Sequence, residues 1–117
     1  MAQYEHLPIY KKAMDIAVYI ENIVKGFPRY HKYTVGADLR NLSRAALRLI
    51  IRANSERDKL DTLCLLRDTI EELKVVVRLC KETKAFNSFN SFKHLIEDVI
   101  SLSRQSEGWL KSMRGQK

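Results

Sequence analysis

Apolar residues recur at intervals of three and four along most of the chain, which is the spacing of one face of an α-helix. The first series is Ile9, Ala13, Ile16, Ile20, Ile23 and Phe27. Pro8 suits the first turn of a helix, whereas Gly26 can end a helix as a left-handed cap and Pro28 clashes with continued helix. The sequence therefore predicts a first helix that begins at Pro8 and ends before Pro28.

Three further segments have the same period. The second runs from about Thr34 to Asn54, and a polar connection at residues 55–58 follows it. Asp58 suits the N-cap of a third helix. The apolar positions of that helix have the alternating spacing of a bundle seam and are Leu63, Leu66, Ile70, Leu73, Val77 and Cys80. A fourth helix begins near Phe92, after a cluster of Asn and Ser in residues 85–91, and continues to about Met113.

These four amphipathic segments determine the expected fold. No stretch alternates apolar and polar residues for long enough to indicate a strand, and four amphipathic helices with short connections pack as a bundle. We therefore predict an all-α, up-down-up-down four-helix bundle that forms a single domain over residues 1–117. Phe27 and Tyr33 are expected to pack at one end of the bundle. Gly36 is expected to permit a close approach of neighbouring backbone.

The residues that usually carry catalysis or bind metal ions are scarce. Cys64 and Cys80 lie about 24 Å apart on one predicted helix, too far for a disulfide, and are expected to be small buried or half-buried residues. None of His6, His31 and His94 follows a Glu by three positions, as a di-metal carboxylate site in a bundle requires. The glycines are isolated, so no phosphate loop is present. We predict no catalytic residues, no metal, no cofactor and no enzyme activity.

The chain is basic, and its basic residues are unevenly placed. It has 21 Lys and Arg against 14 Asp and Glu, a net charge of +7. More than half of this excess falls in residues 31–57, which favours a surface that faces a polyanion. The longest stretch without a charged residue, residues 85–92, is too short for a membrane span. We expect a cytoplasmic protein without membrane contact.

Four arginines in the second predicted helix recur every four residues. They are Arg40, Arg44, Arg48 and Arg52, which we call the arginine ladder. Each step of four advances about 40° around the helix, so the ladder occupies an arc of about 120° opposite the apolar face and is about 18 Å long. Asp38 is the only carboxylate between residues 30 and 55. Because guanidinium groups bind phosphates, the ladder predicts contact with a nucleic-acid backbone; the alternative is an ordinary solvated helix face.

Other basic residues extend this prediction. The further candidates for nucleic-acid binding are Arg29, His31, Lys32, Lys111 and Arg114. Tyr30 and Tyr33 interleave with the first three and offer rings for base stacking. Lys117 extends the basic tail that begins at Lys111.

Some apolar residues fall outside the predicted core faces. They are Met14, Val18, Leu47, Ile51, Leu65, Val76 and Leu79. Two interpretations are open: a wide core face, or an interface with a second copy of the chain or with a partner protein. We favour the interface, which would place part of the arginine ladder at a subunit boundary.

Several short motifs resemble those of a known family, the accessory variability determinant proteins of diversity-generating retroelements. They are FPRYHKYTVGADLR at residues 27–40, RAN at 52–54, DKL at 58–60, RLC at 78–80 and GWL at 108–110. The resemblance covers nearly the whole chain, and more distant proteins encoded in intervening sequences of 23S ribosomal RNA share its four-helix fold. It implies a small, non-enzymatic bacterial or phage protein that forms a homo-pentamer.

The same resemblance implies the partners of the protein. In that family the protein accompanies the reverse transcriptase of the retroelement and binds its template-repeat RNA, and DNA is a second candidate ligand. Together they support mutagenic cDNA synthesis. Two alternatives stay open: an rRNA- or ribosome-associated protein of the intervening-sequence type, and a helical protein–protein adaptor whose arginines meet acidic patches on a partner without any nucleic acid.

Overall fold

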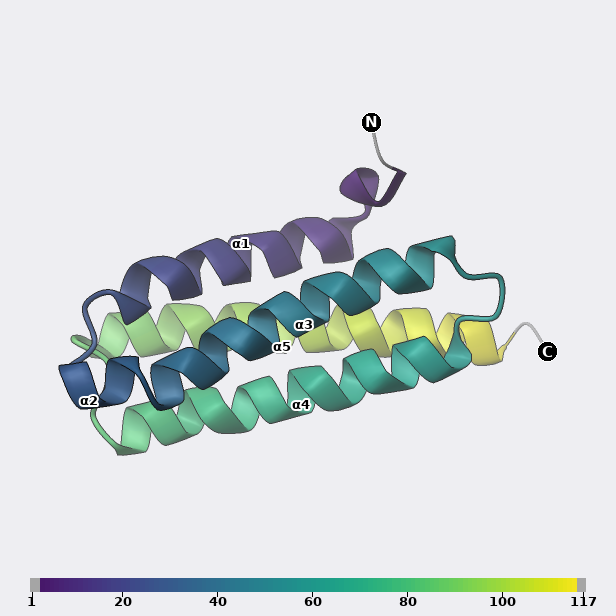
Figure 1. The fold of residues 1–117 in the computed structure, drawn as a ribbon. Coiled ribbons are helices and arrows are strands. Elements are labelled where there is room, and N and C mark those ends of the chain that lie inside the picture. The colour runs from purple at the N-terminus through teal and green to yellow at the C-terminus, as the bar shows by residue number, and fades with distance from the viewer. Residues whose placement is uncertain (1–2, 116–117) are drawn as a thin grey trace.

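The computed structural model describes residues 3–115, in which four long helices lie side by side (Figure 1). They are α1 (Pro8–Val24), α3 (Val35–Ser55), α4 (Leu60–Glu82) and α5 (Phe89–Arg114). A short 3-10 helix, η1 (Gln3–His6), precedes α1, and the one-turn helix α2 (Arg29–Lys32) joins α1 to α3. Residues 3–115 contain no strand, so the predicted all-helical fold with four long helices is confirmed for them.

Each long helix packs against two others. Helices α3 and α5 both pack against α1 and α4, so α3 and α5 lie diagonally across the bundle. The α1–α3 and α4–α5 connections lie at one end, which we call the α2 end, and the α3–α4 connection lies at the other (Figure 1). Of the helices in residues 3–115, none is long and apolar enough to cross a membrane.

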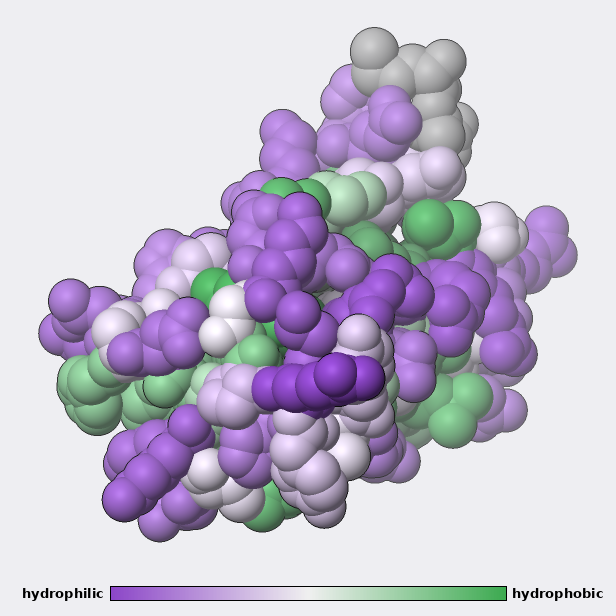
Figure 2. Space-filling view, turned by 60° about the vertical axis from the view of Figure 1, so that its left-hand side comes forward, coloured by the Kyte–Doolittle hydropathy of each residue, from purple (hydrophilic) through white to green (hydrophobic). Residues whose placement is uncertain are grey.

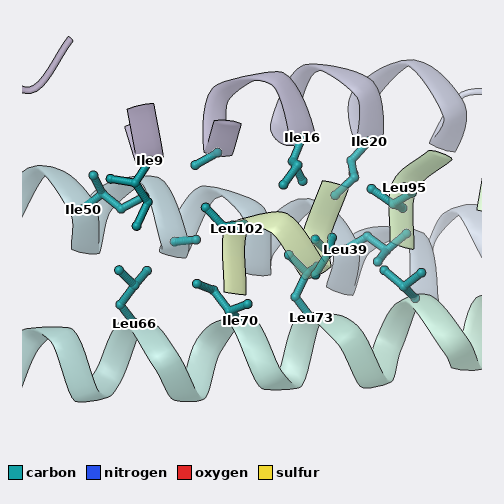
Figure 3. Close-up of a cluster of buried hydrophobic side chains, with 14 of the residues drawn as sticks. Ile9, Ile16, Ile20, Leu39, Ile50, Leu66, Ile70, Leu73, Leu95 and Leu102 are labelled. Carbon is teal, nitrogen blue, oxygen red and sulfur yellow. The ribbon is translucent and has the colours of Figure 1, made fainter. Parts of the chain in front are cut away.

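The predicted apolar faces meet along the axis of the bundle. Figure 3 shows buried residues from all four long helices, among them Ile16, Ile20, Leu39, Ile50, Leu66, Ile70, Leu73, Leu95 and Leu102. Each is at most 1 % exposed. Because burying one such side chain contributes about 1.5–3 kcal/mol, this seam supplies most of the drive to fold. It also leaves the charged residues of every helix on the outside.

One predicted helix cap is wrong. No glycine among residues 3–115 has a positive φ, so Gly26 is not a left-handed cap. Its lack of a side chain matters for a different reason, because an ideal Cβ at Gly26 would lie 2.6 Å from Nδ2 of Asn87. The residue with a left-handed backbone is Lys84, with φ 63°, just after α4.

Of three predictions for the segment that leads into α3, two are confirmed and one is wrong. An ideal Cβ at Gly36 would lie 2.9 Å from Cγ1 of Val24 and 3.0 Å from the carbonyl oxygen of His31, so the expected close approach is confirmed. Phe27 is buried at the bundle end as predicted, at 4 % exposed. Tyr33 is 70 % exposed and does not pack there, because α2 turns its ring toward solvent.

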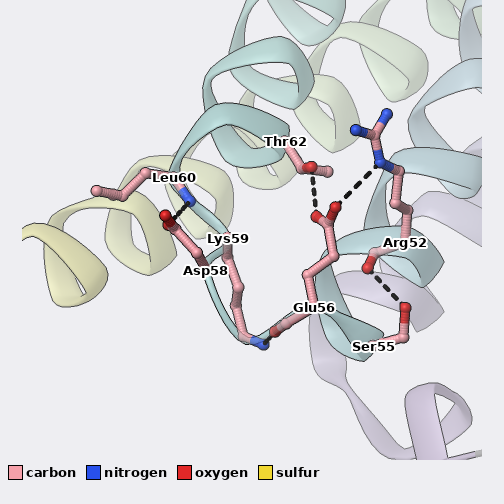
Figure 4. Close-up of polar contacts among 7 residues, drawn as sticks. All are labelled: Arg52, Ser55, Glu56, Asp58, Lys59, Leu60 and Thr62. Carbon is pink, nitrogen blue, oxygen red and sulfur yellow. Dashed lines mark hydrogen bonds and ion pairs between the residues drawn. The ribbon is translucent and has the colours of Figure 1, made fainter.

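The carboxylate of Glu56 holds the turn between α3 and α4 together (Figure 4). It accepts a hydrogen bond from the hydroxyl of Thr62 and another from Nε of Arg52 at 3.3 Å. The Thr62 bond, more than the charge of Arg52, lowers the pKa of Glu56. Asp58 accepts a hydrogen bond from the backbone N–H of Leu60 at 3.3 Å, although the helix itself begins at Leu60 with Lys59 as its N-cap.

The two cysteines are predicted to differ sharply in reactivity. Cys80 lies fully in the core, where burial and, second, the charge of Asp38 raise the pKa of its thiol to about 12, whereas Cys64 is half-buried. Because the thiolate is the reactive form, a disulfide reagent at about pH 8 is expected to label Cys64 in the folded protein and Cys80 only after denaturation. Labelling of both thiols at similar rates without denaturant would contradict this core.

Candidate nucleic-acid interface

The arginine ladder crosses the outer side of α3 diagonally. At its start, Nε of Arg40 and Nη2 of Arg44 lie 3.0 and 2.7 Å from the carboxylate oxygens of Glu21 on α1. At its other end, Arg48 and Arg52 line a groove between α3 and α4. Because each four-residue step turns about 40° around the helix, the ladder passes from the α1 side to the α4 side.

Carboxylates partly neutralise the ladder. Glu21 pairs with Arg40 and Arg44, and Glu56 pairs with Arg52 at 3.3 Å; no carboxylate of residues 3–115 lies within 4.0 Å of the Arg48 guanidinium. Acidic residues are scarce near the ladder in the sequence, but the fold places two carboxylates, those of Glu21 and Glu56, against it. Two carboxylates still oppose four guanidinium groups, and ion pairs this exposed each contribute only about 0–1 kcal/mol. The surface stays cationic, and an incoming phosphate can replace either carboxylate at small cost.

A pocket of about 240 Å³ connects the ladder to α2, and we call it the basic pocket. Three cations line it, Lys25 after α1, Lys32 of α2 and Arg40 of α3, together with Tyr33 and Glu21. Ammonium and guanidinium groups that converge on one hollow suit an anion of phosphate size. The structure thus brings together Lys32 and Arg40, which the sequence predicted as site residues. It adds Lys25, which sequence reasoning missed although only seven residues separate it from Lys32.

Helix α2 presents the other residues of the predicted basic cluster. Arg29 is exposed and His31 is half-buried. The rings of Tyr30 and Tyr33 are 75 % and 70 % exposed, and the Tyr30 carbonyl accepts a hydrogen bond from the hydroxyl of Thr34 at 2.8 Å. Figure 2, in which the α2 end comes forward, shows hydrophilic side chains over most of this face with smaller hydrophobic patches between them. Exposed rings among cations are the elements of a surface that stacks unpaired bases.

The basic tail lies apart from the ladder. Lys111 and Arg114 are exposed in the last turns of α5, the helix diagonal to α3. Nη2 of Arg114 lies 4.0 Å from Sγ of Cys64 on α4. The structure therefore does not bring these two residues together with the ladder, and Lys117 lies outside the residues that it describes.

The apolar residues outside the predicted core faces divide into two groups. Four are exposed, at 37 to 52 %: Met14, Val18, Leu65 and Leu79. Leu47, Ile51 and Val76 are half-buried, and Leu47 and Val76 pack against the core, as the wide-core interpretation requires. Val75 of α4, which the sequence also places outside the predicted seam, is 65 % exposed.

The groove between α3 and α4 joins the two kinds of surface. Its volume is about 440 Å³, and its lining includes Arg48, Arg52, Leu49, Leu65 and Thr69. The far end of the ladder therefore borders an apolar surface, whereas its near end opens into the basic pocket. The α1 side of the ladder is therefore mainly cationic, whereas the α4 side combines cationic and apolar groups.

Comparison with known proteins identifies the family. The family model described as bAvd-like matches residues 7–113, a span that contains the ladder, α2 and the basic pocket. A comparison with curated proteins found no match. The family match confirms the resemblance that the motifs at residues 27–40 and beyond indicate. Because one family model accounts for nearly all of the chain, this protein belongs to the bAvd-like family.

Proposed function

We propose that this protein is a non-enzymatic accessory of a retroelement reverse transcriptase, which binds the template RNA and holds it with the enzyme during mutagenic cDNA synthesis in the cytoplasm. Membership of the bAvd-like family supports the accessory role. The observation that supports nucleic-acid binding is the excess of cations over carboxylates from the basic pocket along the arginine ladder. In this proposal the four long helices have up-down-up-down order, which the positions of their connections in Figure 1 support.

The geometry of the ladder suits a phosphate backbone. Successive arginines of the ladder are about 6 Å apart along the axis of α3, and a nucleic-acid strand presents a charge every few ångströms. Glu21 brings the guanidinium groups of Arg40 and Arg44 together beside the basic pocket. A phosphate at this place would compete with the carboxylate for both groups, and the cost of displacing the carboxylate is small because exposed ion pairs are weak.

Loss of the ladder is expected to lower both the affinity for RNA and the dependence of that affinity on salt concentration. With all four ladder arginines changed to Ala, filter binding of a structured RNA should show lower affinity. The slope of log affinity against log salt should be shallower by about 0.7–0.9 for each lost phosphate contact. The charge-matched comparison sets Arg44→Ala/Arg48→Ala in the ladder against Arg78→Ala/Arg104→Ala, two exposed arginines on α4 and α5 whose loss should leave affinity nearly unchanged. Equal losses in ladder and control variants would remove the ladder from the account.

Removal of the Glu21 charge is expected to have the opposite effect. Glu21→Gln frees Arg40 and Arg44 for phosphate, so RNA affinity should rise about two- to fivefold at low salt. Glu72→Gln on the exposed side of α4 changes the net charge by the same amount without touching the ladder. A similar gain in both variants would show that total charge decides binding, and a loss in Glu21→Gln would contradict the exchange of carboxylate for phosphate.

The assembly is also part of the proposal. We assign the exposed apolar residues of α4 to contacts between copies in a homo-pentamer, with the reverse transcriptase as the other partner. Light scattering of the full chain should give five times the 13.7 kDa protomer mass. Leu65→Lys and Leu79→Lys should lower that mass, whereas Ile100→Lys on α5, also exposed, should not. A single protomer in solution at all concentrations would contradict the assembly.

One observation favours a second candidate, a protein–protein adaptor without nucleic acid. Three ladder arginines already bind carboxylates, so the same groups could bind acidic side chains of a partner protein. Co-purification of a partner protein together with absent RNA binding would support this function. A ribosome-associated role of the intervening-sequence type would use the same cationic surface, and a gene inside a ribosomal RNA operon would support it.

A further inference from the structure

The turn between α4 and α5 holds a second hollow, which the arginine ladder does not reach. Its volume is about 230 Å³. Its walls include Lys81, Lys84, Phe86, Asn87, Phe89 and Phe92, and we call it the Phe89 pocket. None of these residues was selected from the sequence as a functional residue, because residues 85–91 resemble an ordinary polar turn.

A chain of aromatic rings holds one wall of this pocket in place. The ring of Phe27, buried at the bundle end, lies 5.5 Å from that of Phe86, which lies 5.8 Å from Phe92; Phe92 in turn lies 5.7 Å from Phe89. Phe86 and Phe92 are half-buried against the core, but Phe89 is 65 % exposed. The outermost ring is therefore supported from the core side and open on the other side. One exposed ring alone would need no explanation.

Two lysines of the pocket, Lys81 and Lys84, indicate that a ligand of the Phe89 ring would be negatively charged. Nζ of Lys81 lies 5.1 Å from the centre of the Phe92 ring. Lys84 has a left-handed backbone, with φ 63°. Its backbone N–H donates a hydrogen bond to the carbonyl of Lys81 at 3.1 Å, and the N–H of Ala85 donates one to the carbonyl of Cys80 at 2.9 Å. These two bonds satisfy carbonyl groups at the end of α4. Glycine fits this left-handed position best, since a side chain there carries a conformational cost. Lys84 occupies this position despite that cost, and no carboxylate of residues 3–115 lies within 4.0 Å of the Lys84 ammonium group.

The pocket also adjoins the cationic surface already described. Gly26 packs so closely on the Asn87 side chain that the turn after α1 and the turn after α4 are in contact. Lys25, which follows α1, and Arg29 and Tyr30 of α2 therefore lie at the same end of the bundle as the α4–α5 turn that forms the Phe89 pocket (Figure 1). Basic residues predominate at this end of the bundle. An acidic residue is also present, Glu82, whose carboxylate lies 4.0 Å from Nζ of Lys81. An extended polyanion that leaves the pocket can continue to the basic pocket.

We propose that the Phe89 pocket binds an unpaired base of single-stranded RNA, which stacks on Phe89 while its neighbouring phosphates contact Lys81 and Lys84. Every base has a face that stacks on an aromatic ring, but a base inside a duplex is not free to do so. The exposed amide of Asn87 offers hydrogen bonds to a base edge. This inference rests on the proposed function and adds to it that the protein selects single-stranded segments of its RNA.

The test compares two labelled RNAs by fluorescence anisotropy with the full chain: an unstructured uridine-rich strand, and a blunt-ended, fully paired duplex whose strands have the same length. Phe89→Leu keeps an apolar side chain without an aromatic face, and Phe89→Trp keeps the face. We expect Phe89→Leu to weaken binding of the single strand about tenfold and leave binding of the duplex within twofold, while Phe89→Trp keeps the affinity for both. Lys84→Gly should weaken binding of the strand while it raises the melting temperature, so the loss cannot come from unfolding.

The outcomes separate this inference from the function on which it rests. If the unchanged chain binds neither RNA, the proposed function fails. If it binds both and Phe89→Leu binds the strand as tightly as before, the Phe89 pocket is not a base site although nucleic-acid binding stands. If Phe89→Leu lowers the mass in light scattering and leaves RNA binding unchanged, the pocket is a contact between copies of the chain, which also overturns the inference.

Discussion

Burial of one apolar face from each long helix determines where the charges of this chain lie. On α3 the buried residues include Leu39, Ala46, Ile50 and Ala53, so the side chains opposite them must face outward. A repeat of four residues does not match the 3.6 residues of a helical turn, and the arginines on that outer side drift around the helix as they ascend it. The core and the helical repeat together convert a regular sequence pattern into a diagonal cationic surface that borders α1 at one end and α4 at the other.

The neighbouring helix then adjusts this surface. Glu21 of α1 removes part of the positive charge, and it brings Arg40 and Arg44 together beside the basic pocket. A phosphate can replace the Glu21 carboxylate on such a surface at small cost, because exposed ion pairs contribute little to stability and are screened by salt. At the α2 end, the exposed rings and lysines add a site suited to unpaired bases. In the proposed function, phosphate contacts and base stacking together would favour a flexible RNA strand over a rigid duplex.

Sequence periodicity was sufficient for the helices and the core, because the 3.6-residue repeat is a local property: α1 begins at Pro8 as predicted, and Cys80 lies in the core. It was not sufficient for the pairing of the ladder with Glu21, which depends on which helix packs beside α3. The left-handed residue was predicted at Gly26, where glycine is favoured, but lies at Lys84, where local preference opposes it. Pairings between helices and strained positions depend on tertiary structure; the first occur at the arginine ladder and the second at the Phe89 pocket.

The most direct test of a nucleic-acid-binding α3 face is arginine footprinting by mass spectrometry. Phenylglyoxal would modify the full chain with and without a single-stranded RNA at low salt. The account predicts that Arg44 and Arg48 lose most of their reactivity when RNA is added, while Arg78 of α4 and Arg104 of α5, also exposed, keep theirs. Protection of Arg78 and Arg104 with unchanged modification of Arg44 and Arg48 would place the RNA elsewhere and contradict the account.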